Sequence, residues 1–309
     1  MGTTLRIAVS ASSRSVGLRA IDAAFEAVRA WDDRLSTWRD DSEIARLNHG
    51  APGQPVALSP PLYTLLQEVV QWARLTGGAF DPSVGPLVDA WDLRGAGRIP
   101  DGTTLSRARA ACGLQHFIFD DRARTVSRTD SAAWLDSGGF GKGVALGAAR
   151  HALVQRGVNS GSLNFGGQVL VLGPGALNGD WLVPVAHPRD RARPAAWLHF
   201  RDRSASTSSQ SEHFVTINRR QLGHILDPRT GRPVPPWGSV TVVAQDPALA
   251  DVVSTALLVL GPEVGLEWAR SRSDVAVLFL ILRGGKVERR WNAALNQYLV
   301  PDSTLSRGA

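Results

Sequence analysis

The sequence predicts an α+β fold in which mixed sheets and flanking helices form a single intertwined unit over residues 1–300, as one body or as two lobes, followed by a polar tail at 301–309. Strand-like alternation recurs near both ends of the chain, and stretches with helical spacing separate the strands. No internal repeat and no low-complexity linker marks a domain boundary. With 309 residues, 43% of them hydrophobic, the chain can build an ample core.

The first predicted strand is Leu5–Ser12, where apolar and polar residues alternate. Residues 18–47 then show helical apolar spacing, interrupted around Ser36–Trp38. Ser42 followed by Glu43 is typical of a helix start with a capping serine. The part of this stretch after Ser42, up to Leu47, is therefore predicted to be a short helix of its own.

The next predicted helix is Pro60–Leu75, because prolines favour the first turn and the pair Gly77–Gly78 ends a helix. Residues 117–119 and 125–126 predict a hairpin around Asp120–Asp121.

The second half of the chain predicts a helix at Lys142–Val154 and another that contains Asp251. Four apolar runs there predict strands: Gln168–Gly173, Trp181–Val185, Ser239–Ala244 and Val275–Leu282.

Composition narrows the class of protein. Lys and Arg number 34 against 28 Asp and Glu, for a net charge of +6, and most of the basic residues are Arg. They are scattered rather than gathered in a stripe, which argues against a nucleic-acid surface. The single Cys112 excludes an internal disulfide and a cysteine metal cage.

The chain shows no apolar run suited to span a membrane, and its first residues lack a signal-peptide pattern. A soluble, cytoplasmic protein is therefore expected, whereas a leader removed from the natural protein would leave a periplasmic or exported location open. The sequence gives no indication of oligomeric state.

Asp251 and Thr255 are the most informative pair, because a spacing of four places both on one helical face. A carboxylate and a hydroxyl among aliphatic residues suit a hard cation that keeps coordination sites for phosphates. In the alternative interpretation, Asp251 starts its helix and Thr255 bonds back to the preceding turn.

Two glycine-rich stretches could approach a ligand closely. In the first, Gly77–Gly78 precedes Phe80 and Asp81, although a simple helix stop explains it equally well. In the second, Leu135–Gly143, a glycine turn opens a helix with Lys142 at its start. This arrangement suits phosphate, but it matches neither the P-loop nor the dinucleotide fingerprint.

The stretch Asn164–Gln168 and the turn after His224 are less specific. The glycines of the former fit a bulge as well as a ligand site. His224 precedes the turn Asp227–Gly231 and can titrate near neutrality, although a lone histidine is more often structural.

Together these segments resemble one family, the FAD:protein FMN transferases or ApbE-type flavin transferases. The resemblance runs from Met1 to about Gly261 and is most specific in the run HILDPRTG. Its pieces, in the family's order, are Leu35–Trp38 with Asp41–Glu43 and Leu47–Asn48, Gly77–Pro82, Leu135–Asp136 to Lys142–Gly143, Asn164–Gly167, His224–Gly231 and Ala250–Thr255.

The resemblance implies an enzyme that uses FAD and Mg²⁺ to transfer FMN through its phosphate to a Ser or Thr hydroxyl of an acceptor protein, with release of AMP. It also implies which residues bind. The FAD contacts would be Met1, Trp38, Ala79, Phe80, Asp81, Asp136, Lys142 and Ile225. The metal ligands would be the Gly139 carbonyl, Asp251 and Thr255. The catalytic residues would be Asp251 and His224, the latter as the base that accepts the hydroxyl proton.

The chain departs from the family pattern at several polar positions. Gln168 stands where the family has Asp, Ser209 where it has Gly, and Gln210 and Ser211 where it has Asp and Tyr. Gly147 also replaces an Asp. These departures leave two alternatives open: an FAD pyrophosphatase that yields FMN and AMP, and a flavin-binding protein without transferase activity. The sequence does not name the acceptor protein.

Overall fold

The computed structural model describes residues 2–211, 214–217 and 220–301. The chain forms two compact units. Unit 1 comprises Met1–Arg29, Lys142–Ser209 and Trp237–Ala309; unit 2 comprises Ala30–Gly141 and Gln210–Pro236. The chain passes from one unit to the other four times, so neither unit is a continuous stretch. The predicted tail at 302–309, like Met1, lies outside the described residues.

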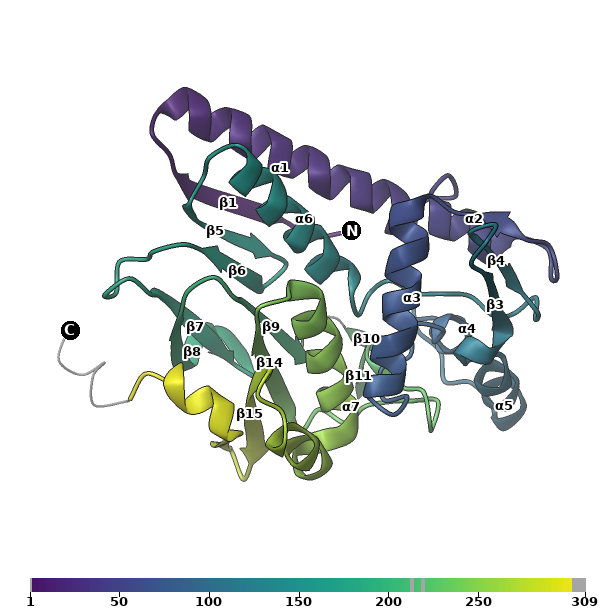
Figure 1. The fold of residues 1–309 in the computed structure, drawn as a ribbon. Coiled ribbons are helices and arrows are strands. Elements are labelled where there is room, and N and C mark those ends of the chain that lie inside the picture. Colours follow the sequence, from purple (N-terminus) through teal and green to yellow (C-terminus); the bar gives the residue numbers. More distant parts are fainter. Residues whose placement is uncertain (1, 212–213, 218–219, 302–309) are drawn as a thin grey trace. The chain divides into compact units, whose positions relative to one another are not determined.

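Unit 1 is built on a seven-stranded sheet in which every neighbouring pair is antiparallel (Figure 1). Its strands, in spatial order, are β1 (Leu5–Ser10), β5 (Ser160–Phe165), β6 (Gln168–Leu172), β9 (Ser204–Ser209), β14 (Gly238–Ala244), β15 (Val275–Arg283) and β16 (Lys286–Trp291).

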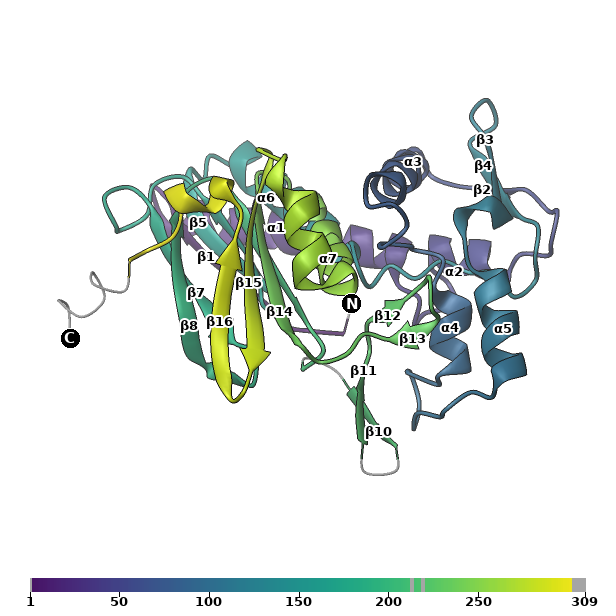
Figure 2. The same cartoon turned by 90° about the horizontal axis from the view of Figure 1, so that it is seen from below.

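The two faces of this sheet are covered differently (Figure 2). The ribbon of β7 (Trp181–His187) and β8 (Asp190–Phe200) packs on one face, where Val185, Leu198 and Phe200 join an apolar cluster with Leu278 and Leu280. Helix α7 (Pro247–Arg270) packs on the other face, against β9 and β14. The other described helices of unit 1 are α1 (Arg14–Leu35), which continues into unit 2, α6 (Gly141–Gln155) and the short η2 (Ala293–Gln297). Because both faces are covered, every residue of β14 is buried, including Ser239 and Thr241, and β15 is apolar from Val275 to Leu282.

Helix α7 begins at Pro247, with Asp246 as its N-cap and the Asp246 side chain accepting a hydrogen bond from the Ala248 N–H. Asp251 therefore lies in the second turn, and the interpretation in which it starts the helix is wrong. Among the described residues, α7 alone is long and apolar enough to cross a membrane, which is weak evidence for a span because a buried core helix meets the same criteria. Its packing against the sheet and its break at Gly261, where φ is 78°, identify it as the core helix of unit 1.

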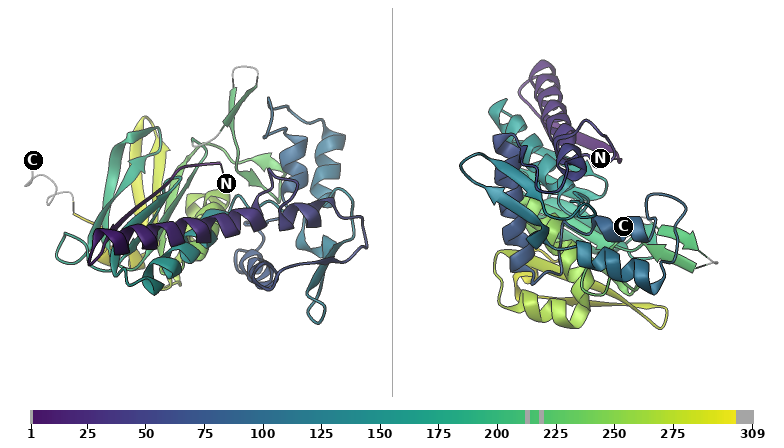
Figure 3. Two further views of the ribbon diagram at one scale, coloured as in Figure 1. Left: turned by 90° about the horizontal axis from the view of Figure 1, so that it is seen from above. Right: turned by 90° about the vertical axis from the view of Figure 1, so that its right-hand side faces the viewer.

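The described residues of unit 2 form four α-helices after the end of α1, a three-stranded sheet and two short ribbons. Helices α4 and α5 lie side by side (Figure 3). The helices are α2 (Glu43–His49), α3 (Pro60–Leu75), α4 (Gly85–Ala90) and α5 (Gly102–Ala111), with a 3₁₀ turn η1 (Leu114–His116). The sheet has the order β2 (Val56–Ala57), β4 (Thr125–Arg128), β3 (Phe117–Asp120); the ribbons are β10 (Phe214–Ile217) with β11 (Arg220–Gly223) and β12 (Leu226–Asp227) with β13 (Arg232–Pro233).

Candidate functional site

Asp251 is a buried carboxylate, 2% exposed, that faces three donors within unit 1. Its Oδ2 accepts a hydrogen bond from the Gly143 N–H at 3.1 Å, and its Oδ1 accepts one from the Ser206 hydroxyl at 3.2 Å. The Lys142 Nζ lies 3.3 Å from the same Oδ1. Because Gly143 is in the first turn of α6, the positive end of that helix also favours the negative charge. A buried carboxylate is tolerated here because each of these groups compensates it.

A cluster of hydroxyls continues from Asp251 along the facing surfaces of α7 and β9. The Thr255 hydroxyl donates to the Asp251 carbonyl at 3.2 Å, which confirms the back-bond expected in the alternative interpretation. Ser208 lies 2.8 Å from Ser254 and 3.4 Å from Thr255, oxygen to oxygen. The back-bond uses the hydroxyl hydrogen of Thr255 and leaves oxygen lone pairs that can ligate a cation.

The donor set around Asp251 fits Mg²⁺. It offers a carboxylate and neutral hydroxyl oxygens, the ligands that this ion prefers, and Mg²⁺ needs few of them from the protein. No group of three or more His, Cys, Asp or Glu occurs among the described residues, so a cage built from those side chains does not compete with this arrangement. Gly139 belongs to unit 2, and its carbonyl as a third ligand stays a prediction.

The start of α6 is held against the start of α7 by a close approach of the two backbones. A Cβ added to Gly143 would lie 2.3 Å from the Pro247 carbonyl oxygen, so this position requires glycine. Gln168 fixes the same end of α7, because its Nε2 donates to the Pro247 carbonyl at 2.8 Å and to Ser204 at 3.2 Å. At Gly147, another departure from the family, an added Cβ would lie 3.4 Å from the Pro247 Cγ.

In unit 2, Arg94 connects two residues that are predicted to contact FAD. Its guanidinium donates to the Asp136 carboxylate at 2.7 Å and lies 4.7 Å from the centre of the Trp38 ring. It also donates to the Thr37 carbonyl at 2.8 Å and stacks on Trp134 at 4.6 Å. Trp38 is 68% exposed, so one large aromatic surface remains available to a planar ligand.

The predicted FAD contacts Ala79 and Phe80 are buried, and Phe80 packs edge to face on Phe140. The Asp81 carboxylate accepts two hydrogen bonds from Ser83, at 2.8 Å from the N–H and 2.6 Å from the hydroxyl. Burial raises the pKa of Asp81 despite these bonds. The glycine stretch does end α3, because the helix is capped at Thr76 and Gly77 and Gly78 follow with φ of 61° and 76°. The FAD contacts of Ala79, Phe80 and Asp81 stay predictions.

His224 lies between β11 and β12, and Gln210 holds the backbone of its neighbour, Ile225. The Gln210 Nε2 donates to the carbonyls of Ile225 at 2.6 Å and Val234 at 2.9 Å, and its Oε1 accepts from the Ile225 N–H at 3.0 Å. Gln210 is only 4% exposed. An Asp at this position, which the family has, could accept a hydrogen bond but not donate to either carbonyl.

The structure therefore brings the predicted residues together in two groups. Unit 1 holds Lys142, Asp251 and Thr255 in contact through Asp251. Unit 2 holds the other described residues: Trp38, Ala79, Phe80, Asp81, Asp136, Gly139, His224 and Ile225. Arg94 was missed by the sequence analysis, and Gln210 appeared there only as a departure from a pattern.

Comparison with known proteins shows the family to which the chain belongs. Residues 1–279 match the ApbE family, so the chain belongs to that family, and the predicted resemblance is confirmed. Among curated relatives, an FAD:protein FMN transferase of Salmonella typhimurium is 30% identical, with 98% of this chain and 88% of the relative covered. One of Klebsiella pneumoniae is 28% identical, with 94% and 85% covered.

Two solved structures are similar along their whole length. The flavin transferase ApbE from Vibrio cholerae has a TM-score of 0.80 at 27% identity, covering 97% of this chain and 96% of the other. The ApbE protein from Thermotoga maritima has a TM-score of 0.85 at 28% identity, covering 93% and 94%. The predicted α+β fold is confirmed by these likenesses and by the sheets and helices described above.

Proposed function

We propose that this protein is a Mg²⁺-dependent FAD:protein FMN transferase. In the proposed reaction, the oxygen of an acceptor Ser or Thr attacks the phosphorus on the FMN side of the FAD pyrophosphate. The bond from that phosphorus to the bridging oxygen breaks, AMP leaves with the bridging oxygen, and the hydroxyl proton passes to a base. The observation that carries the proposal is the buried Asp251, in contact with Lys142 and a cluster of hydroxyls.

The residues of unit 1 are suited to the charged part of the substrate. Asp251 and Thr255, with the Gly139 carbonyl, would hold Mg²⁺, which neutralises charge on the phosphates when bound. Lys142 reaches Asp251 at 3.3 Å and would give a charge-assisted hydrogen bond to a phosphate oxygen. The positive end of α6 adds to the same attraction for anions.

The residues of unit 2 are suited to the aromatic part and to proton transfer. Trp38 offers an exposed indole, and Arg94 fixes the Asp136 carboxylate beside it. His224 carries an imidazole, a group that can accept a hydroxyl proton, and is the proposed base. The relatives from Klebsiella pneumoniae and Salmonella typhimurium are named FAD:protein FMN transferases, which supports the same activity.

The decisive experiment separates three activities. The protein is incubated with FAD and Mg²⁺, with and without an acceptor that carries a Ser/Thr-Gly-Ala-Thr type segment, and AMP and covalently bound flavin are measured. The proposal expects AMP release together with flavin attached to the acceptor, and loss of both on chelation of the metal. AMP release without acceptor indicates the pyrophosphatase alternative; FAD binding with no AMP indicates a non-catalytic flavin-binding protein.

A further inference from the structure

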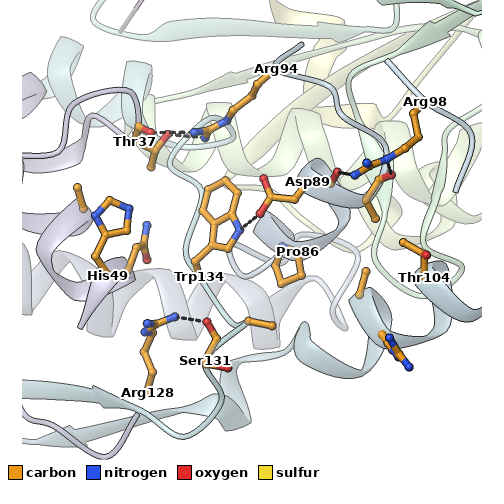
Figure 4. Close-up of a pocket in the computed structure, with 16 residues that line it drawn as sticks. Thr37, His49, Pro86, Asp89, Arg94, Arg98, Thr104, Arg128, Ser131 and Trp134 are labelled. Atoms are coloured by element: carbon orange, nitrogen blue, oxygen red, sulfur yellow. Dashed lines mark hydrogen bonds between the residues drawn. The ribbon is translucent and has the colours of Figure 1, made fainter. Parts of the chain in front are cut away.

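Unit 2 contains a cavity of about 560 Å³ that none of the predicted FAD or metal residues lines. It is formed by side chains from α2, α4 and α5 and from the segments 94–98 and 128–134. Figure 4 shows Trp134 near its middle, with Arg94 and Arg98 above and Arg128 below. A volume of this size accommodates a small organic ligand.

The charge of this cavity is strongly positive. Four arginines and His49 line it, against one carboxylate, that of Asp89, which accepts a hydrogen bond from the Trp134 indole at 2.8 Å. Arg94 is neutralised by Asp136. The other three arginines are Arg98, Arg107 and Arg128. None of them forms an ion pair with a residue that the structure describes.

Arg128 is a buried positive charge that forms no ion pair with any described carboxylate. Its side chain is in the wall of the cavity and is only 5% exposed. Its hydrogen bonds go to backbone carbonyls, those of Ser131, Ala133 and Gly50, and its Nε has no partner in the described part of the chain. Burial lowers its pKa, and Asp130 acts on it only at longer range. Carbonyl oxygens satisfy its hydrogen bonds but do not neutralise its charge.

Arg98 and Arg107 supply the accessible part of the positive charge. Arg98 is fixed in place, since its guanidinium donates to the carbonyls of Ala90 at 3.0 Å and Asp89 at 2.6 Å, at the end of α4. Arg107 is exposed on α5, and the Asp101 carboxylate, which caps that helix, acts on it without forming an ion pair. A guanidinium that is held in place, as that of Arg98 is, favours phosphate, which it can bind through two parallel N–H donors.

We propose that this cavity is a second ligand site, and that it binds a small phosphate-bearing molecule through Arg98, Arg107 and the charge of Arg128. Arg94 lies in its wall and also contacts Trp38 and Asp136, so a ligand here would adjoin two residues predicted to contact FAD. The site does not depend on the proposed transferase activity, because it is defined by binding alone.

Equilibrium dialysis with radiolabelled inorganic phosphate at fixed ionic strength tests the proposal. Arg107→Gln is the main variant, because its side chain is exposed and its loss should leave folding intact. Arg122→Gln is the matched control, since it removes the same charge from an exposed turn outside the cavity. Arg98→Lys keeps the charge but loses the planar fork, and Lys142→Ala reports phosphate bound instead beside Asp251.

The proposal expects saturable phosphate binding that weakens about tenfold in Arg107→Gln, as for the loss of one charge-assisted hydrogen bond. Binding should also weaken in Arg98→Lys and stay unchanged in Arg122→Gln and Lys142→Ala. No saturable binding, or binding lost only in Lys142→Ala, would overturn it. Equal loss in Arg107→Gln and Arg122→Gln would indicate an adventitious ion only, and preferential binding of succinate in a parallel dialysis would refute the phosphate assignment.

Discussion

Replacement of Gln210 by Glu changes one NH₂ group to an oxygen and tests the role of this side chain directly. In the structure, that NH₂ donates to the carbonyls of Ile225 and Val234, and the amide oxygen accepts from the Ile225 N–H. An ionised Glu has no donor, so both carbonyls would face a buried negative charge. A protonated Glu keeps one O–H donor and can still satisfy one of them.

The expected loss of stability follows from these contacts. Each buried carbonyl left without a donor costs about 1–3 kcal/mol, so the protonated variant should lose about that amount and the ionised one about twice as much. Because the folded protein favours the neutral acid, the pKa of the introduced Glu should be raised above its unfolded value of about 4.3. The variant is therefore least destabilised below that pH, and the loss grows by about 1.4 kcal/mol per pH unit until the folded pKa is reached.

Urea unfolding followed by tryptophan fluorescence, from pH 4 to pH 8, measures this loss. Gln210→Met is the matched control, because it removes the donors and the acceptor without adding a charge and should be destabilised equally at every pH. If Gln210→Glu follows the same pH profile as Gln210→Met, or is as stable as the unaltered protein at pH 8, the assignment of the Gln210 contacts is refuted.

Three further outcomes are expected. Asp251→Ala should abolish Mg²⁺-dependent AMP release, because it removes the charged ligand. Thr255→Ala removes one neutral oxygen and should only raise the Mg²⁺ concentration that is required. Full activity of Asp251→Ala in a metal titration would contradict this expectation. His224→Asn should lower the rate of flavin transfer, measured in single turnover, and leave the Kd for FAD, measured by titration, within about a few-fold, as expected for a base. If the transfer rate and the affinity for FAD fall equally, His224 is a binding or structural residue. Cys112 should resist iodoacetamide at pH 8 until urea unfolds the protein, since burial and the Asp81 charge raise the pKa of its thiol to about 12; rapid labelling of the native protein, seen by mass spectrometry, would show that the thiol is accessible.

The sequence predicted the helices whose ends are marked by particular residues. Helix α3 runs from Pro60 to Leu75 as predicted, because prolines fix its first turn and glycines follow its end. The Ser42 side chain accepts from the Ala45 N–H at 3.0 Å, which confirms the predicted cap of α2. Strands β6, β7, β14 and β15 were also predicted, because their apolar runs are long enough to identify.

Strand β9 could not be predicted, although it is the central strand of the sheet. Its sequence, SASTSS, contains no large apolar residue and is typical of a loop. It is buried because its hydroxyls find partners on other elements: Thr207 lies 2.8 Å from Thr241, and Ser206 donates to Asp251. Helices α4 and α5 were missed for a related reason, since α4 is short and α5, GTTLSRARAA, has only a weak apolar face. Tertiary contacts, rather than local pattern, decide such segments.

The departures from the family pattern gain a physical meaning only from contacts that are distant in sequence. Gln168 and Gln210 both stand where the family has Asp, and both use an NH₂ group that Asp lacks to bind a backbone carbonyl. Gln168 holds Pro247, the first residue of the helix that carries Asp251, and Gln210 holds Ile225, the neighbour of His224. Each amide therefore fixes the backbone of a segment that carries a residue predicted to be catalytic. In the sequence these two positions favoured a flavin-binding protein without activity, but side chains that hold such segments are equally suited to an active enzyme. The contacts of Gln168 and Gln210 therefore do not favour either alternative.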